Sequence, residues 1–155
     1  IGACYIGYHG DSAWTYPVGK ISKQKHDLLK HTEESLFAGL SVIKEGARIG
    51  DIGYAVSSVA NKYHLGVVKE LVGHGVGTSV HEAPDVPNYG RKGNGSILKA
   101  GDTIAIEPMA TLGNGRIKQD KNDDWTIYSK DNSLCAHFEH TVLITEDGVE
   151  ILTQL

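Results

Sequence analysis

Hydrophobic positions follow helical spacing in the first part of the chain. After Ser22, a suitable N-cap, one stripe runs to about residue 45 and carries Leu29, Leu36, Leu40 and Ile43, with Leu28 and Val42 beside it. Gly46 is a typical helix stop. A second and cleaner stripe covers residues 51–63 and carries Ile52, Ala55, Val56, Val59, Ala60 and Tyr63. The pattern therefore predicts two amphipathic helices, at residues 22–45 and 51–63.

Short β-like segments lie on both sides of these helices. Residues 3–5 and 8–16 are joined by Ile6-Gly7, which predicts a hairpin. Later runs are broken by Gly, Pro and Asn, and they predict strands at residues 67–68, 103–107, 125–128, 138–145 and 149–152. Asp147-Gly148 is a tight-turn signal between the last two. The order of elements predicts an α+β fold, with two helices packed on a largely antiparallel, curved sheet.

Composition narrows the class of protein. The 155 residues carry 15 Lys and Arg against 19 Asp and Glu, and no basic run suggests a nucleic-acid surface. We see no apolar run of membrane-spanning length and no signal-peptide pattern. Two distant cysteines, Cys4 and Cys135, do not make a disulfide framework, although one disulfide stays open. These features predict one globular domain in a reducing cytoplasm, without membrane or nucleic-acid partners.

Metal-binding side chains stand in unusual settings at four places. They are Asp11 in the hairpin, His74 in the glycine-rich segment 73–77 with His81 after it, Glu107 at the end of an apolar strand, and Glu139 at the start of another. A carboxylate in an apolar setting costs free energy unless it is paired or bound to a cation. Three carboxylates and one imidazole suit one or two ions of Mn, Fe, Co or Zn. A structural zinc site would instead require cysteines and closed tetrahedral coordination.

Each of these features also has a simpler interpretation. A buried Glu more often pairs with Lys or Arg, and the glycine-rich segment could be only a turn. No phosphate-loop lysine or helix signal follows this segment, so a nucleotide cradle is not predicted. The order and spacing of the four features together nevertheless favour a metal centre.

At this point the motifs resemble a known family. Residues 73–84 with Asn88-Tyr89, the triplet Glu107-Pro108-Met109 and residues 133–141 are similar to the signatures of type I methionine aminopeptidases, and the resemblance covers nearly the whole chain. It implies the pita-bread α+β fold and two divalent ions, Co, Mn, Fe or Zn, without indicating which is native.

The resemblance also implies roles for individual residues. The metal ligands would be Asp11, His74, Glu107 and Glu139, with Glu107 also the general base, His81 a substrate-binding catalytic residue, and Trp125 a border of the methionine pocket. The implied activity is that of a monomeric methionyl aminopeptidase. Such an enzyme would remove the N-terminal methionine from nascent proteins through a metal-bridging hydroxide. Docking on the ribosome stays open.

Two departures from the family pattern stand out. The family's first Asp ligand lies eleven residues before the second, which would be one position before Ile1. We therefore expect residues 1–155 to be the catalytic domain without its N-terminal half, and to be inactive alone. Leu71 also stands where the family has Met, Phe or Tyr.

Three other classes of the same fold are alternatives to this family. Xaa-Pro aminopeptidases and prolidases share the His-Gly-x-Gly segment. They have Glu-Pro-Gly in place of Glu107-Pro108-Met109, and Arg-x-Glu in place of His137-Phe138-Glu139. Type II methionine aminopeptidases carry a large insertion between the two Glu ligands, which this chain lacks. A non-catalytic binding module of this fold would have lost ligands, whereas every ligand position that the chain covers is intact.

Overall fold

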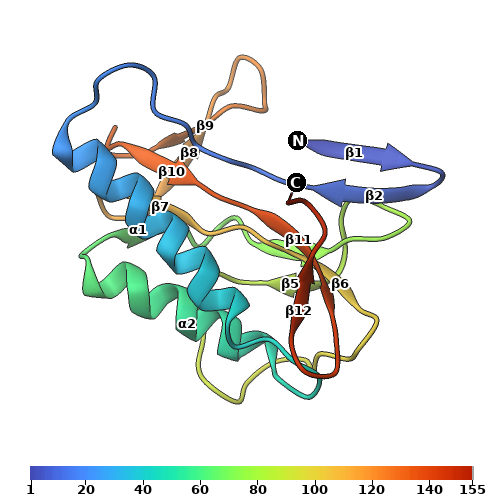
Figure 1. Cartoon of the computed structure of the whole chain (residues 1–155). Helices are drawn as coiled ribbons and strands as arrows, with labels where there is room; N and C mark the ends of the chain where they lie inside the picture. The colour runs from blue at the N-terminus through green and yellow to red at the C-terminus, as the bar shows by residue number, and fades with distance from the viewer. Residues whose placement is uncertain (155) are drawn as a thin grey trace.

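Two helices lie on the same side of the strands in the computed structural model, which describes residues 1–154 (Figure 1). Helix α1 covers Lys23–Leu40 and helix α2 covers Ile49–Lys62. Ser22 caps α1 as predicted, since its side chain accepts a hydrogen bond from the Lys25 amide at 3.4 Å. Most of the predicted apolar positions face the core, so both helices are confirmed. Neither helix has the length and apolar composition that a bilayer-spanning helix requires.

The predicted end of the first helix, at residue 45, is wrong by five residues. The chain leaves the helix after Leu40, and Ile43 turns back into the core. The amides of residues 41–43 still bond locally, to carbonyls three or four residues back, and only then do Glu45 and Gly46 donate to the distant carbonyls of Thr145 and Leu98. The chain thus turns out of the helix before its apolar stripe ends.

All strand pairs among the described residues are antiparallel. Strand β1 (Gly2–Tyr5) pairs with β2 (Tyr8–Asp11), and β8 (Ile117–Gln119) with β9 (Ile127–Ser129). A five-stranded sheet has the order β12 (Val149–Ile151), β11 (His140–Ile144), β6 (Thr103–Ile106), β4 (Gly73–Gly75) and β5 (Glu82–Val86). A three-stranded sheet has the order β10 (Cys135–His137), β7 (Met109–Thr111) and β3 (Gly66–Val67). The predicted α+β class with antiparallel strands is confirmed.

Both predicted hairpins are present. In the first, Ile6 and Gly7 have positive φ angles of 51° and 83°, as a two-residue turn of the primed kind requires. Its second strand ends at Asp11, not at residue 16. In the second, the Thr145 amide donates to the Gly148 carbonyl between β11 and β12. Cys4 and Cys135 are free and exposed, and they form no disulfide.

Two long stretches of extended chain, β6–β7 and β10–β11, are each interrupted by two residues, and the two breaks lie next to each other. Glu107-Pro108 separates β6 from β7, and Phe138-Glu139 separates β10 from β11. At the break, the Glu139 amide donates to the Ala13 carbonyl at 2.7 Å instead of joining the sheet. The two sheets therefore meet where the two glutamates lie.

Side chains along β6 and β11 alternate between the two faces of the sheet, and this alternation places the two glutamates on one face. Ile104 and Ile106 on β6, and Val142 on β11, pack with the helices in the hydrophobic core. Successive side chains of a strand point to opposite faces, so Ala105 and Thr141 face away from the helices. Glu107 and Glu139 continue this second series. The polar site consequently lies on the side of the sheet opposite α1 and α2.

Candidate metal centre

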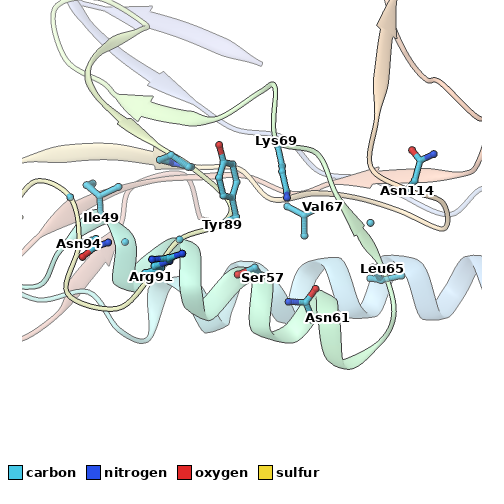
Figure 2. A pocket seen from close by; sticks show the side chains of 15 residues that line it. Ile49, Ser57, Asn61, Leu65, Val67, Lys69, Tyr89, Arg91, Asn94 and Asn114 are labelled. Atoms are coloured by element: carbon cyan, nitrogen blue, oxygen red, sulfur yellow. The ribbon is translucent and has the colours of Figure 1, made fainter.

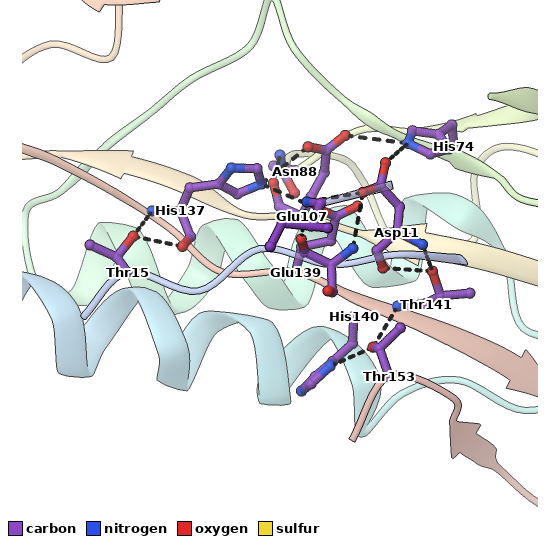
Figure 3. A network of polar contacts seen from close by, with 12 residues as sticks. Asp11, Thr15, His74, Asn88, Glu107, His137, Glu139, His140, Thr141 and Thr153 are labelled. Atoms are coloured by element: carbon purple, nitrogen blue, oxygen red, sulfur yellow. Dashed lines mark hydrogen bonds and ion pairs between the residues drawn. The ribbon is translucent and has the colours of Figure 1, made fainter. Parts of the chain in front are cut away.

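Four predicted ligands converge at the junction of the two sheets (Figure 3). Asp11 ends β2, His74 is central in β4, Glu107 follows β6, and Glu139 precedes β11. The Nε2 atom of His74 lies 4.0 Å from Asp11 Oδ2 and 3.9 Å from Glu107 Oε1. Segments far apart in the sequence thus bring three carboxylates around one imidazole.

The donor atoms form two groups that share His74. His74, Glu107 and Glu139 offer ligand atoms that lie within 4.8 Å of one another, and so do Asp11, His74 and His81. The site is rich in carboxylates with few nitrogens, a set that suits divalent transition ions. Spacing of this kind is compatible with an ion in each group.

Neighbouring groups orient several of these side chains. His74 Nδ1 lies 2.9 Å from the Gly75 carbonyl, to which it can donate, so that Nε2 is left to face a cation. The Asp11 amide donates to Thr141 Oγ1 at 2.9 Å, and this hydroxyl donates to the Asp11 carbonyl at 2.8 Å. The backbone of Asp11 is thereby held against β11.

The surroundings of Glu139 favour a bound cation at this cluster. Glu139 is 3% exposed, and its Oε1 has no hydrogen-bond partner. Burial, and then the nearby Glu107 and Asp11 carboxylates, raise the pKa of Glu139 to about 8. No Lys or Arg of residues 1–154 lies within ion-pair distance of these three carboxylates, so the simpler pairing with Lys or Arg is not observed. A divalent cation would offset the repulsion and complete the coordination.

A pocket of about 770 Å³ opens beside the cluster, and both Glu107 and His81 line it. Its other walls are largely apolar and include Leu71, Met109 and Trp125. The His81 ring is exposed and edge-on to His74, with ring centroids 4.1 Å apart. Trp125 is 84% exposed and projects from the segment before β9. The pocket can accept an apolar side chain next to the carboxylates.

Sequence reasoning missed His137. Its Nε2 lies 3.2 Å from Glu107 Oε2 and 4.0 Å from Glu139 Oε2. Asn88 was missed as well, although its side-chain amide donates to the Glu107 carbonyl at 3.0 Å. Both residues stand inside the motifs that carry the resemblance. Their positions in those motifs were a signal, but their contacts depend on the tertiary structure.

A second pocket, of about 680 Å³, lies apart from this cluster (Figure 2). It is bordered by α2, Lys69, Tyr89 and Arg91, and it contains none of the predicted site residues. Ser57 and Asn61 of α2 also line it. None of the three carboxylates lines this second pocket, whereas Glu107 lines the pocket of about 770 Å³.

Comparison with known proteins agrees with this geometry. Over all 155 residues, the chain is 49% identical to methionine aminopeptidase 1 of Bacillus subtilis and covers 62% of that protein. A crystal structure of methionine aminopeptidase from Rickettsia prowazekii superposes with a TM-score of 0.96 at 40% identity, over 99% of this chain and 62% of the other. The chain thus spans about three-fifths of the length of these relatives. The resemblance to methionine aminopeptidases and the pita-bread fold are confirmed.

More distant relatives share the fold alone. Prolidase from Pyrococcus furiosus superposes with a TM-score of 0.76 at 24% identity, over 99% of this chain and 40% of the prolidase chain.

A family profile described as metallopeptidase family M24 matches residues 1–146. Because this match covers nearly the whole sequence, the chain belongs to metallopeptidase family M24.

Proposed function

We propose that the protein is a two-metal aminopeptidase that removes the N-terminal methionine from nascent polypeptides. The observation that carries the proposal is the convergence of Asp11, His74, Glu107 and Glu139 beside an apolar pocket. The names of the relatives support the substrate class. Action on nascent chains requires a cytoplasmic location, which we propose with it.

The proposed cofactors are two divalent ions of Co, Mn, Fe or Zn. Asp11, His74, Glu107 and Glu139 would hold the ions as the ligands that this chain supplies. Such ions would supply Lewis-acid chemistry, which activates water as a nucleophile and polarises a peptide carbonyl. The Asp that we expect directly before Ile1 stays a prediction.

The protein's own residues would bind the substrate and move its protons. The pocket wall with Met109 and Trp125 would hold the methionine side chain. Glu107 lines the same pocket, so its carboxylate could take a proton from the attacking water and deliver it to the leaving nitrogen. His81, on the pocket rim, would donate a hydrogen bond to the substrate as negative charge develops.

The test is an assay of the full-length protein for free methionine from a Met-Ala-Ser peptide. We expect turnover that a chelator abolishes and that Mn²⁺ or Co²⁺ restores. Glu107→Gln should lower kcat by about 10²–10⁴-fold because the proton acceptor is lost. Glu150→Gln, an exposed change on β12, is the matched control and should leave kcat unchanged.

A parallel assay with an Ala-Pro peptide separates this proposal from the prolidase alternative. Hydrolysis of Ala-Pro without release of methionine would refute the proposed specificity. Hydrolysis of neither peptide by metal-loaded protein would support the non-catalytic binding module instead.

A further inference from the structure

The two carboxylate oxygens of Glu107 face different imidazoles (Figure 3). Oε1 lies 3.9 Å from His74 Nε2, on the side of the ligand cluster. Oε2 lies 3.2 Å from His137 Nε2, on the side of the pocket. Each carboxylate oxygen of Glu107 thus faces a different imidazole nitrogen.

The backbone of His137 is held firmly. Thr15 Oγ1 donates to the His137 carbonyl at 2.8 Å and accepts from the His137 amide at 3.0 Å. His137 also pairs with Met109 across β10 and β7. Glu107 lies two residues before Met109, next to this pair. The imidazole therefore approaches Glu107 from a fixed part of the sheet.

The Nε2 atom of His137 is shielded from solvent and has no aligned hydrogen bond among the described residues. A buried donor without a partner is costly, and a small rotation at 3.2 Å would direct its N–H at Glu107 Oε2. Catalytic hydrogen bonds are often long or poorly aligned in apo structures and tighten in the substrate complex. His137 does not belong to either group of clustered ligand atoms. The His137 side chain thus contacts a predicted ligand but is not itself in a ligand group.

We propose that His137 is a positioning residue, which donates to Glu107 Oε2 and so keeps Oε1 directed at the metal centre. This inference rests on the proposed two-metal function. Hydrogen bonds to a ligand's outer atom orient it, and their loss typically lowers metal affinity about 10–100-fold. His137 would act on metal binding through Glu107 without contacting the metal.

The experiment is calorimetric titration of metal-free full-length protein with Mn²⁺, comparing the unmodified protein with His137→Leu and His137→Gln. Leu removes the donor, whereas the Gln amide nitrogen can occupy nearly the same position as Nε2. We expect His137→Leu to weaken binding about 10–100-fold and His137→Gln to recover most of the affinity. Thr15→Val, which loosens His137 but keeps its ring, should weaken binding to a lesser degree.

Each outcome has a defined meaning. Equal affinities in all variants would overturn the inference while leaving the metal centre intact. Equal loss in His137→Leu and His137→Gln would overturn it too, because a direct ligand is not replaced by an amide. Unmodified protein that binds no Mn²⁺ would refute the proposed function, and this inference with it. Should His137→Leu fail to fold by circular dichroism, then undiminished affinity in Thr15→Val overturns the inference.

Discussion

Glu139 is a carboxyl group whose surroundings disfavour its charge. Its pKa is raised from 4.5 to about 8 by burial and by the Glu107 and Asp11 carboxylates. The folded protein therefore keeps a proton that the unfolded chain releases at lower pH. The resulting stability is complete below about pH 4.5 and is lost as pH rises through about 8.

We predict that metal-free protein loses stability between pH 5 and pH 8, and that Glu139→Gln removes this part of the loss. A single proton contributes at most about 1.4 kcal/mol per pH unit to the free energy of unfolding. Urea unfolding of both proteins with a chelator at the two pH values measures the difference. Parallel pH dependences would show that Glu139 is already ionised without metal.

Thr141 is the second residue with a specific structural role, because its hydroxyl holds both backbone groups of Asp11. We predict that Thr141→Val lowers the free energy of unfolding by about 1–3 kcal/mol, since the Asp11 amide loses its partner. Thr141→Ser keeps the hydroxyl and should recover most of the loss. Denaturant titration of the three proteins is the measurement, and a Val variant as stable as the Ser variant would contradict the role.

At the scale of elements, helix α2 supports the site through the segment that carries Asn88. A Cβ on Gly53 would lie 2.3 Å from the Tyr89 carbonyl oxygen and 2.6 Å from that of Pro87. These carbonyls flank Asn88, whose side chain donates to the Glu107 carbonyl. Close packing of α2 on this segment thus depends on the absence of a side chain at position 53.

We predict that Gly53→Ala lowers the free energy of unfolding by about 1–3 kcal/mol, although alanine favours helices. Ser58→Ala, an exposed change on the same helix, is the matched control and should stay within about 0.5 kcal/mol. Thermal and denaturant unfolding measure both variants. A stabilised Gly53→Ala protein would mean that the segment around Asn88 yields without cost.

At the scale of the whole molecule, the candidate ligands come from four separate segments of the chain. Metal can bind them together only in the folded state, so binding adds to stability. We predict that Mn²⁺ at about 100 times its dissociation constant raises the free energy of unfolding by about 2.7 kcal/mol. Replacing Asp11 by Asn together with Glu139 by Gln should abolish the gain. Unfolding with Mn²⁺ or with chelator measures it, and an equal gain in the double variant would place the ion elsewhere.

Local patterns in the sequence were sufficient to predict several secondary-structure elements. The apolar stripes predicted α1 and α2 because helical periodicity extends over many residues, and Ile6-Gly7 predicted a turn that needs positive φ angles. Strands β4, β5, β7, β8 and β10 were not predicted. Each is only three to five residues long, β4 contains Gly and β5 contains Pro, so no local pattern marks them as strands.

The sequence by itself determined the residue types of the candidate site, the two helices and the hairpin turns, because these depend on side-chain chemistry and short-range geometry. The tertiary structure decided the rest. The chain left α1 after Leu40 and returned Ile43 to the core, and the paired strand breaks brought Glu107 and Glu139 together. The same packing set His137 against Glu107. Contacts between distant segments depend on how the whole chain packs, which no local pattern records.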